Sequence, residues 1–239
     1  MTLLQLGIGT VNDVVDAPRD AGRKAGKPIP AGLVSSRSAR IAAVCLFISG
    51  VALAGSVSLG LGAVAVVVAV TGLSYDLVLK GTAWSWLPFA VGIPILPLFG
   101  WFGATGRLAP LFWIVTPAAI GAGAALAIGN ALVDTERDRV AGVSSIALAL
   151  GPVAAGRAAG VLFGAIWLIA IGSAVVDGAG TAVVVGVALA GGVPALASLL
   201  SIGRSVAVRE RAWQAEAVGL AILAAIWLAG ASGSGFGLG

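Results

Sequence analysis

The chain has 239 residues, of which 59% are hydrophobic and 10% charged, with a formal net charge of +4 and a mean hydropathy of +1.07. Soluble domains carry about 25% charged residues, so this composition excludes an ordinary soluble protein and indicates a membrane protein. Histidine is absent, which excludes the commonest metal ligand, so a bound metal would need the oxygen ligands that magnesium and calcium prefer.

The apolar stretches predict an all-α fold, a polytopic bundle of membrane-spanning helices. One span needs about 20 consecutive apolar residues. By that rule the chain contains eight spans, at residues 1–15, 40–57, 59–79, 84–105, 108–133, 153–176, 180–202 and 213–232. We expect them to form one domain over residues 1–239, with two pseudo-repeat halves at about 1–80 and 108–211.

The basic residues predict the orientation of these spans. Alternate loops hold thirteen of the 14 Lys and Arg residues, and the other set of loops holds only Arg107. Basic loops stay in the cytoplasm, which predicts an inner or plasma membrane protein whose N-terminus lies outside. Because Met1 is followed at once by a helix-like apolar run, we expect that a first helix is missing and that the full bundle has nine spans.

Two segments follow the pattern N-x-x-x-D-x-x-x-D, each at the C-terminal end of a predicted span. The first motif comprises Asn12, Asp16 and Asp20, and the second motif comprises Asn130, Asp134 and Asp138. Steps of four residues place the three side chains of each motif on one helical face. Four crossings separate the motifs, so both are predicted to lie on the cytoplasmic side and to face each other across a central cavity.

Carboxylates grouped in this way repel one another unless a counter-charge neutralises them. Two facing sets of oxygen ligands predict bound divalent cations, and magnesium, which prefers a few carboxylates together with phosphates and water, would have its coordination completed by a diphosphate. Basic residues that could bind the diphosphate are Arg23, Lys24, Lys27, Lys80, Arg137 and Arg139. The alternative is that each motif is only a solvated helix end, but six of the ten acidic residues fall within these two segments.

A third polar element, Ser74-Tyr75-Asp76-Leu77-Val78-Leu79-Lys80, ends the third predicted span. Tyr75 could donate a hydrogen bond to a phosphate, and Lys80 could bind one as a point charge. The alternative is an ordinary interfacial anchor, in which the Lys side chain extends toward the membrane surface. The role of Asp76 is left open, since it could simply pair with Lys80.

The sequence resembles the UbiA prenyltransferase superfamily from its first predicted helix to its last. Residues 12–20 followed by G-K-P-I-P-A-G at 26–32 resemble the first motif of that family and its trailing segment. Residues 75–82 resemble its Y-x-x-x-K region, and residues 130–138 followed by S-I-A-L-A-L-G at 145–151 resemble its second aspartate motif. Three departures stand out. The family's first helix has no counterpart in this sequence, and Lys27 replaces the usual Arg. Tyr75 and Lys80 are one residue further apart than in the family pattern, which weakens the expected pairing.

The resemblance implies a helical enzyme of nine spans with a central cavity open to lipid. Its expected activity is the magnesium-dependent transfer of a polyprenyl group from its diphosphate to an acceptor, often aromatic. The partners implied are a polyprenyl diphosphate donor, a small aromatic or lipid-like acceptor and membrane lipid, with no nucleic acid. The first motif would hold one Mg²⁺ and the second motif the other. The residues carried over as catalytic are Asp16, Tyr75, Lys80 and Asp134, and Tyr75 and Lys80 would also face the diphosphate.

Three other interpretations were considered. An ion- or proton-coupled transporter would place its acids near the midplane of the bilayer, whereas here they cluster at predicted helix ends. A CDP-alcohol phosphotransferase would contain D-G-x-x-A-R, which this sequence lacks. An inactive or truncated member of the prenyltransferase family remains an alternative.

Overall fold

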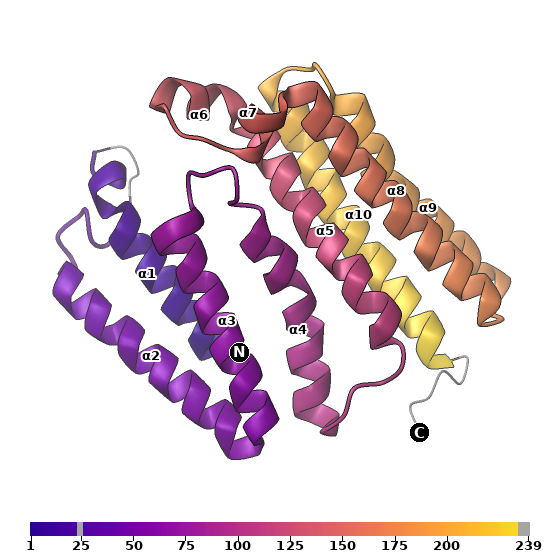
Figure 1. Ribbon diagram of the computed structural model, residues 1–239, viewed down its shortest axis with the longest axis horizontal. Helices are drawn as coiled ribbons and strands as arrows, with labels where there is room; N and C mark the ends of the chain where they lie inside the picture. The colour runs from indigo at the N-terminus through magenta and orange to yellow at the C-terminus, as the bar shows by residue number, and fades with distance from the viewer. Residues whose placement is uncertain (23–25, 234–239) are drawn as a thin grey trace. The chain divides into compact units, whose positions relative to one another are not determined.

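The computed structural model describes residues 1–22 and 26–233, and every regular element within them is helical, as predicted (Figure 1). The helices are α1 (Thr2–Asp20), α2 (Ser36–Val57), α3 (Leu59–Ser74), the π-helical turn η1 (Tyr75–Leu79), α4 (Leu87–Thr105), α5 (Phe112–Val133), α6 (Thr135–Ala141), α7 (Ile146–Leu150), α8 (Pro152–Val176), α9 (Thr181–Ser201) and α10 (Val206–Gly233).

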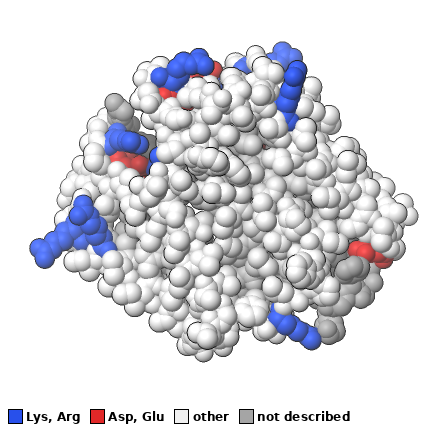
Figure 2. Space-filling model, viewed as in Figure 1, with Lys and Arg blue, Asp and Glu red and all other residues white. Residues whose placement is uncertain are grey.

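Seven helices in the described part of the chain are long and apolar enough to cross a membrane. They correspond to the last seven predicted spans, although α10 begins at Val206 rather than at residue 213. The predicted span at residues 1–15 falls in α1, whose second half carries Asp13, Asp16, Arg19 and Asp20. This charge keeps α1 out of the seven, so an eighth span stays a prediction. The face drawn in Figure 2 is mostly uncharged, as expected for an integral membrane protein.

The chain divides into two compact units, which are described separately. Unit 1 contains residues 1–80 and 95–107, and unit 2 contains residues 81–94 and 108–239. Helix α4 therefore contributes its first part to unit 2 and the remainder to unit 1. The predicted single domain with two pseudo-repeat halves and the predicted central cavity stay predictions.

In unit 1, α1 packs against α2 and α3 through glycines on both neighbours. A Cβ atom at Gly50 of α2 would lie 2.8 Å from Leu4 Cδ2, and one at Gly72 of α3 would lie 2.4 Å from Ile8 Cδ1. Small residues allow transmembrane helices to approach this closely, and van der Waals packing then holds them together. As a result, the end of α1 that carries the first motif lies against η1.

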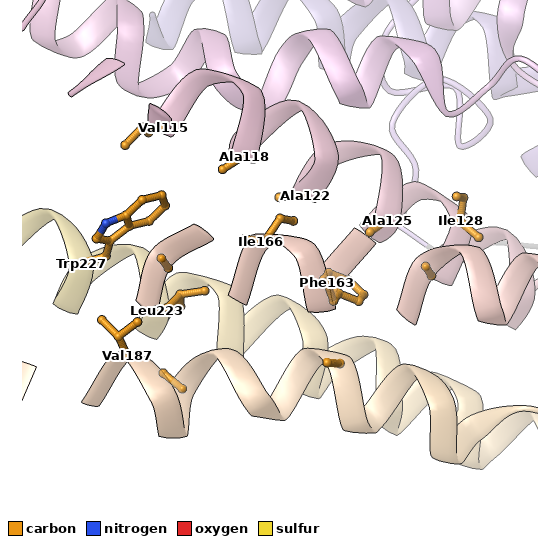
Figure 3. Packing of buried hydrophobic residues seen from close by; sticks show 14 of the residues in the cluster. Val115, Ala118, Ala122, Ala125, Ile128, Phe163, Ile166, Val187, Leu223 and Trp227 are labelled. Atoms are coloured by element: carbon orange, nitrogen blue, oxygen red, sulfur yellow. The ribbon is translucent and has the colours of Figure 1, made fainter. Parts of the chain in front are cut away.

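In unit 2, helices α5, α8, α9 and α10 surround a continuous apolar core (Figure 3). Phe163 of α8, Val187 of α9 and Leu223 of α10 are almost completely buried, and alanines fill the space between them. Trp227 Nε1 donates a hydrogen bond to Ser173 Oγ (2.8 Å), which satisfies the polar atom that this large side chain brings into the core. This packing supports α5 along its length, and the second motif begins near the end of that helix.

Candidate functional site

The first motif meets η1 through two side-chain pairs in unit 1. Asn12 Nδ2 donates a hydrogen bond to Asp76 Oδ1 (2.8 Å), and Lys80 Nζ forms an ion pair with Asp16 Oδ2 (2.6 Å). Both pairs join residues 64 positions apart. Asn12 and Asp16, four residues apart on α1, therefore lie opposite Asp76 and Lys80, which are also four residues apart. Lys80 therefore reaches across to α1 and forms its ion pair with Asp16 rather than with Asp76, the partner that the sequence also allowed.

The π-helical turn explains the extra residue between Tyr75 and Lys80. The backbone N–H of Lys80 donates to the carbonyl oxygen of Tyr75 (2.8 Å), an i to i+5 hydrogen bond in place of the α-helical i to i+4. A turn of this kind accommodates one additional residue and is frequent at functional sites. Lys80 Nζ consequently lies 5.9 Å from the centre of the Tyr75 ring. The longer spacing therefore does not separate the two side chains.

The electrostatics of this cluster depend on Lys80. Its side chain is 24% exposed and that of Asp16 is 14% exposed, so the pair is largely shielded from water. Asp20, the last residue of α1, is also buried. Lys80 is thus a counter-charge for Asp16 on a helix end that carries three aspartates within eight residues.

Lys27 lies beside the first motif but is bound to a residue outside it. Its ammonium group forms an ion pair with Asp13, and this hydrogen bond raises the pKa of Lys27 above 10.5. Lys27 is therefore a fully charged cation next to α1 and about one-third exposed. Arg23 and Lys24, two predicted diphosphate ligands, lie outside the described residues.

The second motif, in unit 2, extends across a break between two helices. Helix α5 ends at Val133, and Asp134 links it to α6. The hydroxyl of Thr135 donates to the carbonyl oxygens of Ala131 and Leu132 (both 3.0 Å). It thereby supplies a hydrogen-bond donor to carbonyl groups in the last turn of α5. Backbone hydrogen bonds nevertheless run from Asp134 to Asn130 (3.2 Å) and from Asp138 to Asp134 (2.8 Å), so the four-residue steps of the motif survive the interruption.

Charged neighbours surround the acids of the second motif. Arg137, which is mostly exposed, pairs with Asp134 at 2.9 Å. Burial raises the pKa of Asp138 above 3.8, and the charge of Asp134 adds to this effect. A nearby cation stabilises the ionised form of a carboxyl group whose pKa is raised in this way. Arg139, another predicted diphosphate ligand, is exposed on α6.

Sequence reasoning missed two buried charged residues on α10. Arg209 forms an ion pair with Glu136 and ties α6 to α10; its hydrogen bond lowers the pKa of Glu136 below 4.5. Glu216 is 2% exposed and lies against Gly129, immediately before the second motif. Charged residues within a spanning helix are expensive and usually functional. The position of Glu216 inside a predicted span was the available signal.

Unit 2 also contains an apolar cavity of about 530 Å³. Side chains of the 81–86 loop, α5, α7 and α8 form its wall, including Trp84, Trp86, Ile128 and Leu162. Its volume lies within the range of small-molecule sites. On α5 the lining residues and the second motif occupy different faces, because Ile128 and Asn130 are about 200° apart around a helix.

The donor chemistry of the first motif fits magnesium. Asn12 and Asp16 offer oxygen atoms, the ligands that this ion prefers, and Asp76 Oδ2 is buried without a hydrogen-bond partner among the described residues. In that same part of the chain, no three His, Cys, Asp or Glu side chains are grouped so that they could hold a metal ion. Lysines supply the counter-charge to Asp13 and Asp16 instead.

The described part of the chain thus combines helices of membrane-spanning length with two aspartate-rich helix ends and a Tyr75–Lys80 contact. Residues 1–215 match the UbiA prenyltransferase family. The chain belongs to this family, and the resemblance seen in its motifs is confirmed.

One curated relative is the digeranylgeranylglyceryl phosphate synthase of Methanopyrus kandleri, which is 34% identical over 158 residues. The alignment covers 64% of this chain, and the chain spans only 56% of that relative's length.

The fold is shared with solved structures of low sequence identity. A structure described for the biosynthesis of digeranylgeranylglyceryl phosphate synthase in membranes matches with a TM-score of 0.81 at 17% identity, over 96% of this chain and 82% of that one. A UbiA homolog from Aeropyrum pernix K1 has a TM-score of 0.67 at 19% identity, with coverage of 95% and 85%. A UbiA homolog from Archaeoglobus fulgidus, bound to GPP and Mg²⁺, has a TM-score of 0.65 at 16% identity, with coverage of 95% and 87%. These structures show that the chain has the UbiA fold.

Proposed function

We propose that the protein is an intramembrane prenyltransferase that moves a polyprenyl group from its diphosphate to an acceptor with the help of Mg²⁺. The observation that carries the proposal is the convergence of Asn12 and Asp16 with Tyr75 and Lys80 in a chain of this family. The Archaeoglobus fulgidus homolog has been solved with GPP and Mg²⁺ and with DMAPP and Mg²⁺, which supports this class of donor.

In this proposal each aspartate motif holds one magnesium ion. The ligands of the first ion are Asn12, Asp16 and Asp20, and those of the second are Asn130, Asp134 and Asp138. Bound magnesium would neutralise the negative charge that grows on the departing diphosphate.

The remaining positive charge would come from the chain itself. Lys80 and the Tyr75 hydroxyl contact diphosphate oxygens, and Lys27 and Arg137 add charge from the loops, joined in the proposal by Arg23, Lys24 and Arg139. The allylic C–O bond breaks and its electron pair leaves with the diphosphate, while Lys80 stabilises the developing oxyanion. The acceptor then forms the new bond to the allylic carbon and releases its proton.

We infer that the acceptor is lipid-like rather than a free aromatic ring. The Methanopyrus kandleri relative is a digeranylgeranylglyceryl phosphate synthase, whose name describes a glyceryl phosphate bearing two prenyl groups. A lipid acceptor can reach a site at a helix end from within the bilayer. We place this site on the cytoplasmic side, because the loops adjoining both motifs carry the basic residues.

The test uses purified protein in detergent micelles with a series of prenyl diphosphates. Mg²⁺-dependent binding is measured by titration calorimetry, and products formed with geranylgeranylglyceryl phosphate or with 4-hydroxybenzoate are identified by mass spectrometry. Asp16→Ala and Asp134→Ala should each abolish Mg²⁺-dependent binding, whereas Asp177→Ala, at the turn between α8 and α9, should not. Unchanged binding in both motif variants would show that the site assignment is wrong.

A further inference from the structure

Asp76 is a buried acid to which the proposed diphosphate chemistry assigns no role. It is the second residue of the π-helical turn and is only 4% exposed. One carboxylate oxygen accepts the hydrogen bond from Asn12, and the other has no hydrogen-bond partner among the described residues. Lys80, the nearest cation along the chain, is directed to Asp16. Burying a carboxylate with an unmet oxygen is costly, so packing alone does not account for it.

The hydrogen bond from Asn12 determines how the amide of that residue is oriented. Asn12 turns its Nδ2 toward Asp76, because this nitrogen donates the hydrogen bond to Asp76 Oδ1 (2.8 Å). Its Oδ1 then points away from Asp76. Without a carboxylate at position 76, either orientation of the amide would be available. Only the oxygen can bind a metal ion, because the amide nitrogen has no free lone pair for a cation.

Asp76, within the π-helical turn, and Lys80, at its end, both contact α1. Asn12 and Asp16 are one α-helical turn apart, and they meet residues 76 and 80 in the same order. Asp76 thus aligns the first residue of the motif while Lys80 holds the second. Carboxylates that orient metal ligands through hydrogen bonds are a recurrent feature of metal sites.

We propose that Asp76 is a positioning residue for the first magnesium site, where it holds Asn12 with Oδ1 available to the ion. This inference rests on the proposed function, in which Asn12 is a magnesium ligand. Asp76 itself acts through Asn12 and contacts neither the diphosphate nor the acceptor.

The experiment measures Mg²⁺ affinity in the presence of a non-reactive prenyl thiodiphosphate, by calorimetry and by Mn²⁺ electron paramagnetic resonance. Asp76→Leu, which is close in size and apolar, should weaken Mg²⁺ binding about 10- to 100-fold, the usual effect of losing such a partner. The matched control Asp177→Leu should not change it. The melting temperature of each variant is recorded, and Asp76→Leu should not lower it because a buried charge is removed.

An exchange of the two side chains separates positioning from simple packing. In Asn12→Asp/Asp76→Asn the hydrogen bond is restored in the opposite direction, and the carboxylate now at position 12 keeps an oxygen for the ion. This double variant should bind Mg²⁺ more tightly than Asn12→Asp, in which two carboxylates abut, and more tightly than Asp76→Leu. Equal weakness in the three variants, or unchanged affinity in Asp76→Leu, would overturn the positioning role. If the natural protein shows no Mg²⁺-dependent diphosphate binding, the proposed function itself fails.

Discussion

Replacing Gly72 by Ala tests whether helix packing in unit 1 sets the geometry of the first motif. The new methyl group would lie 2.4 Å from both Cδ1 and Cγ1 of Ile8 and 3.0 Å from its Cγ2. Carbon atoms in contact prefer about 3.5–4.0 Å, so the two helices must separate by roughly 1 Å at this point. A β-branched side chain such as Ile8 has few alternative rotamers in a helix, which leaves movement of α1 as the main response.

This displacement occurs one helical turn before Asn12. A 2.8 Å hydrogen bond between Asn12 and Asp76 would lengthen beyond the useful limit of about 3.5 Å if α1 moved by 1 Å. Overpacking of this kind costs about 1–3 kcal/mol. The expected result is therefore a lower melting temperature together with at least tenfold weaker Mg²⁺-dependent diphosphate binding.

The assay combines thermal unfolding in detergent with calorimetric titration of Mg²⁺ and a prenyl diphosphate. Gly55→Ala is the matched control, because a Cβ atom at Gly55 has no neighbour within 4 Å; it should retain both stability and binding. Ile8→Ala/Gly72→Ala should recover binding by making room for the new methyl group. Normal diphosphate binding in Gly72→Ala would refute the link between this helix contact and the site.

Three further predictions concern unit 2. The hydrogen bond from Arg209 lowers the pKa of Glu136. The stability that this pair contributes is therefore present above pH 4.5 and is lost as the pH falls through the lowered pKa. Glu136→Gln should flatten the acid limb of a plot of melting temperature against pH, and an unaltered limb would contradict the pairing. Gly129→Ala places a methyl group 2.6 Å from Glu216 Oε2 and should cost about 1–3 kcal/mol of stability, measured by thermal unfolding; a melting temperature equal to that of the natural protein would argue against this close contact. Ala124 lines the cavity of about 530 Å³, so Ala124→Leu places a larger apolar side chain there and should leave the melting temperature unchanged or raise it. A drop as large as that of Gly129→Ala would show that the cavity is already filled.

Much of the architecture followed from composition. Apolar stretches of about 20 residues have few alternatives to a spanning helix, because backbone groups in lipid must be satisfied within the segment. The helices predicted at residues 59–79 and 108–133 accordingly correspond to α3 with η1 and to α5. The start of α10 was predicted too late because Arg209 and Arg211 ended the apolar run there, whereas a helix can continue beyond the apolar part of the bilayer.

The family and its aspartate motifs were also readable from the sequence, since oxygen ligands at four-residue steps and the segments that follow them are local patterns. The interruption at Asp134 was not predicted. At this point the Thr135 hydroxyl donates back to the carbonyl oxygens of Ala131 and Leu132, and such local side-chain hydrogen bonds compete with helix continuation.

The sequence by itself determined that the protein is a helical membrane protein of the UbiA type, because hydropathy and motif spacing depend only on residue order. Only the tertiary structure decided which side chains pair. Lys80 at the end of the π-helical turn binds Asp16, and Gly50 and Gly72 allow α1 to come close to α2 and α3. Such contacts join residues more than 60 positions apart, and their register is set by helix packing that no local pattern records.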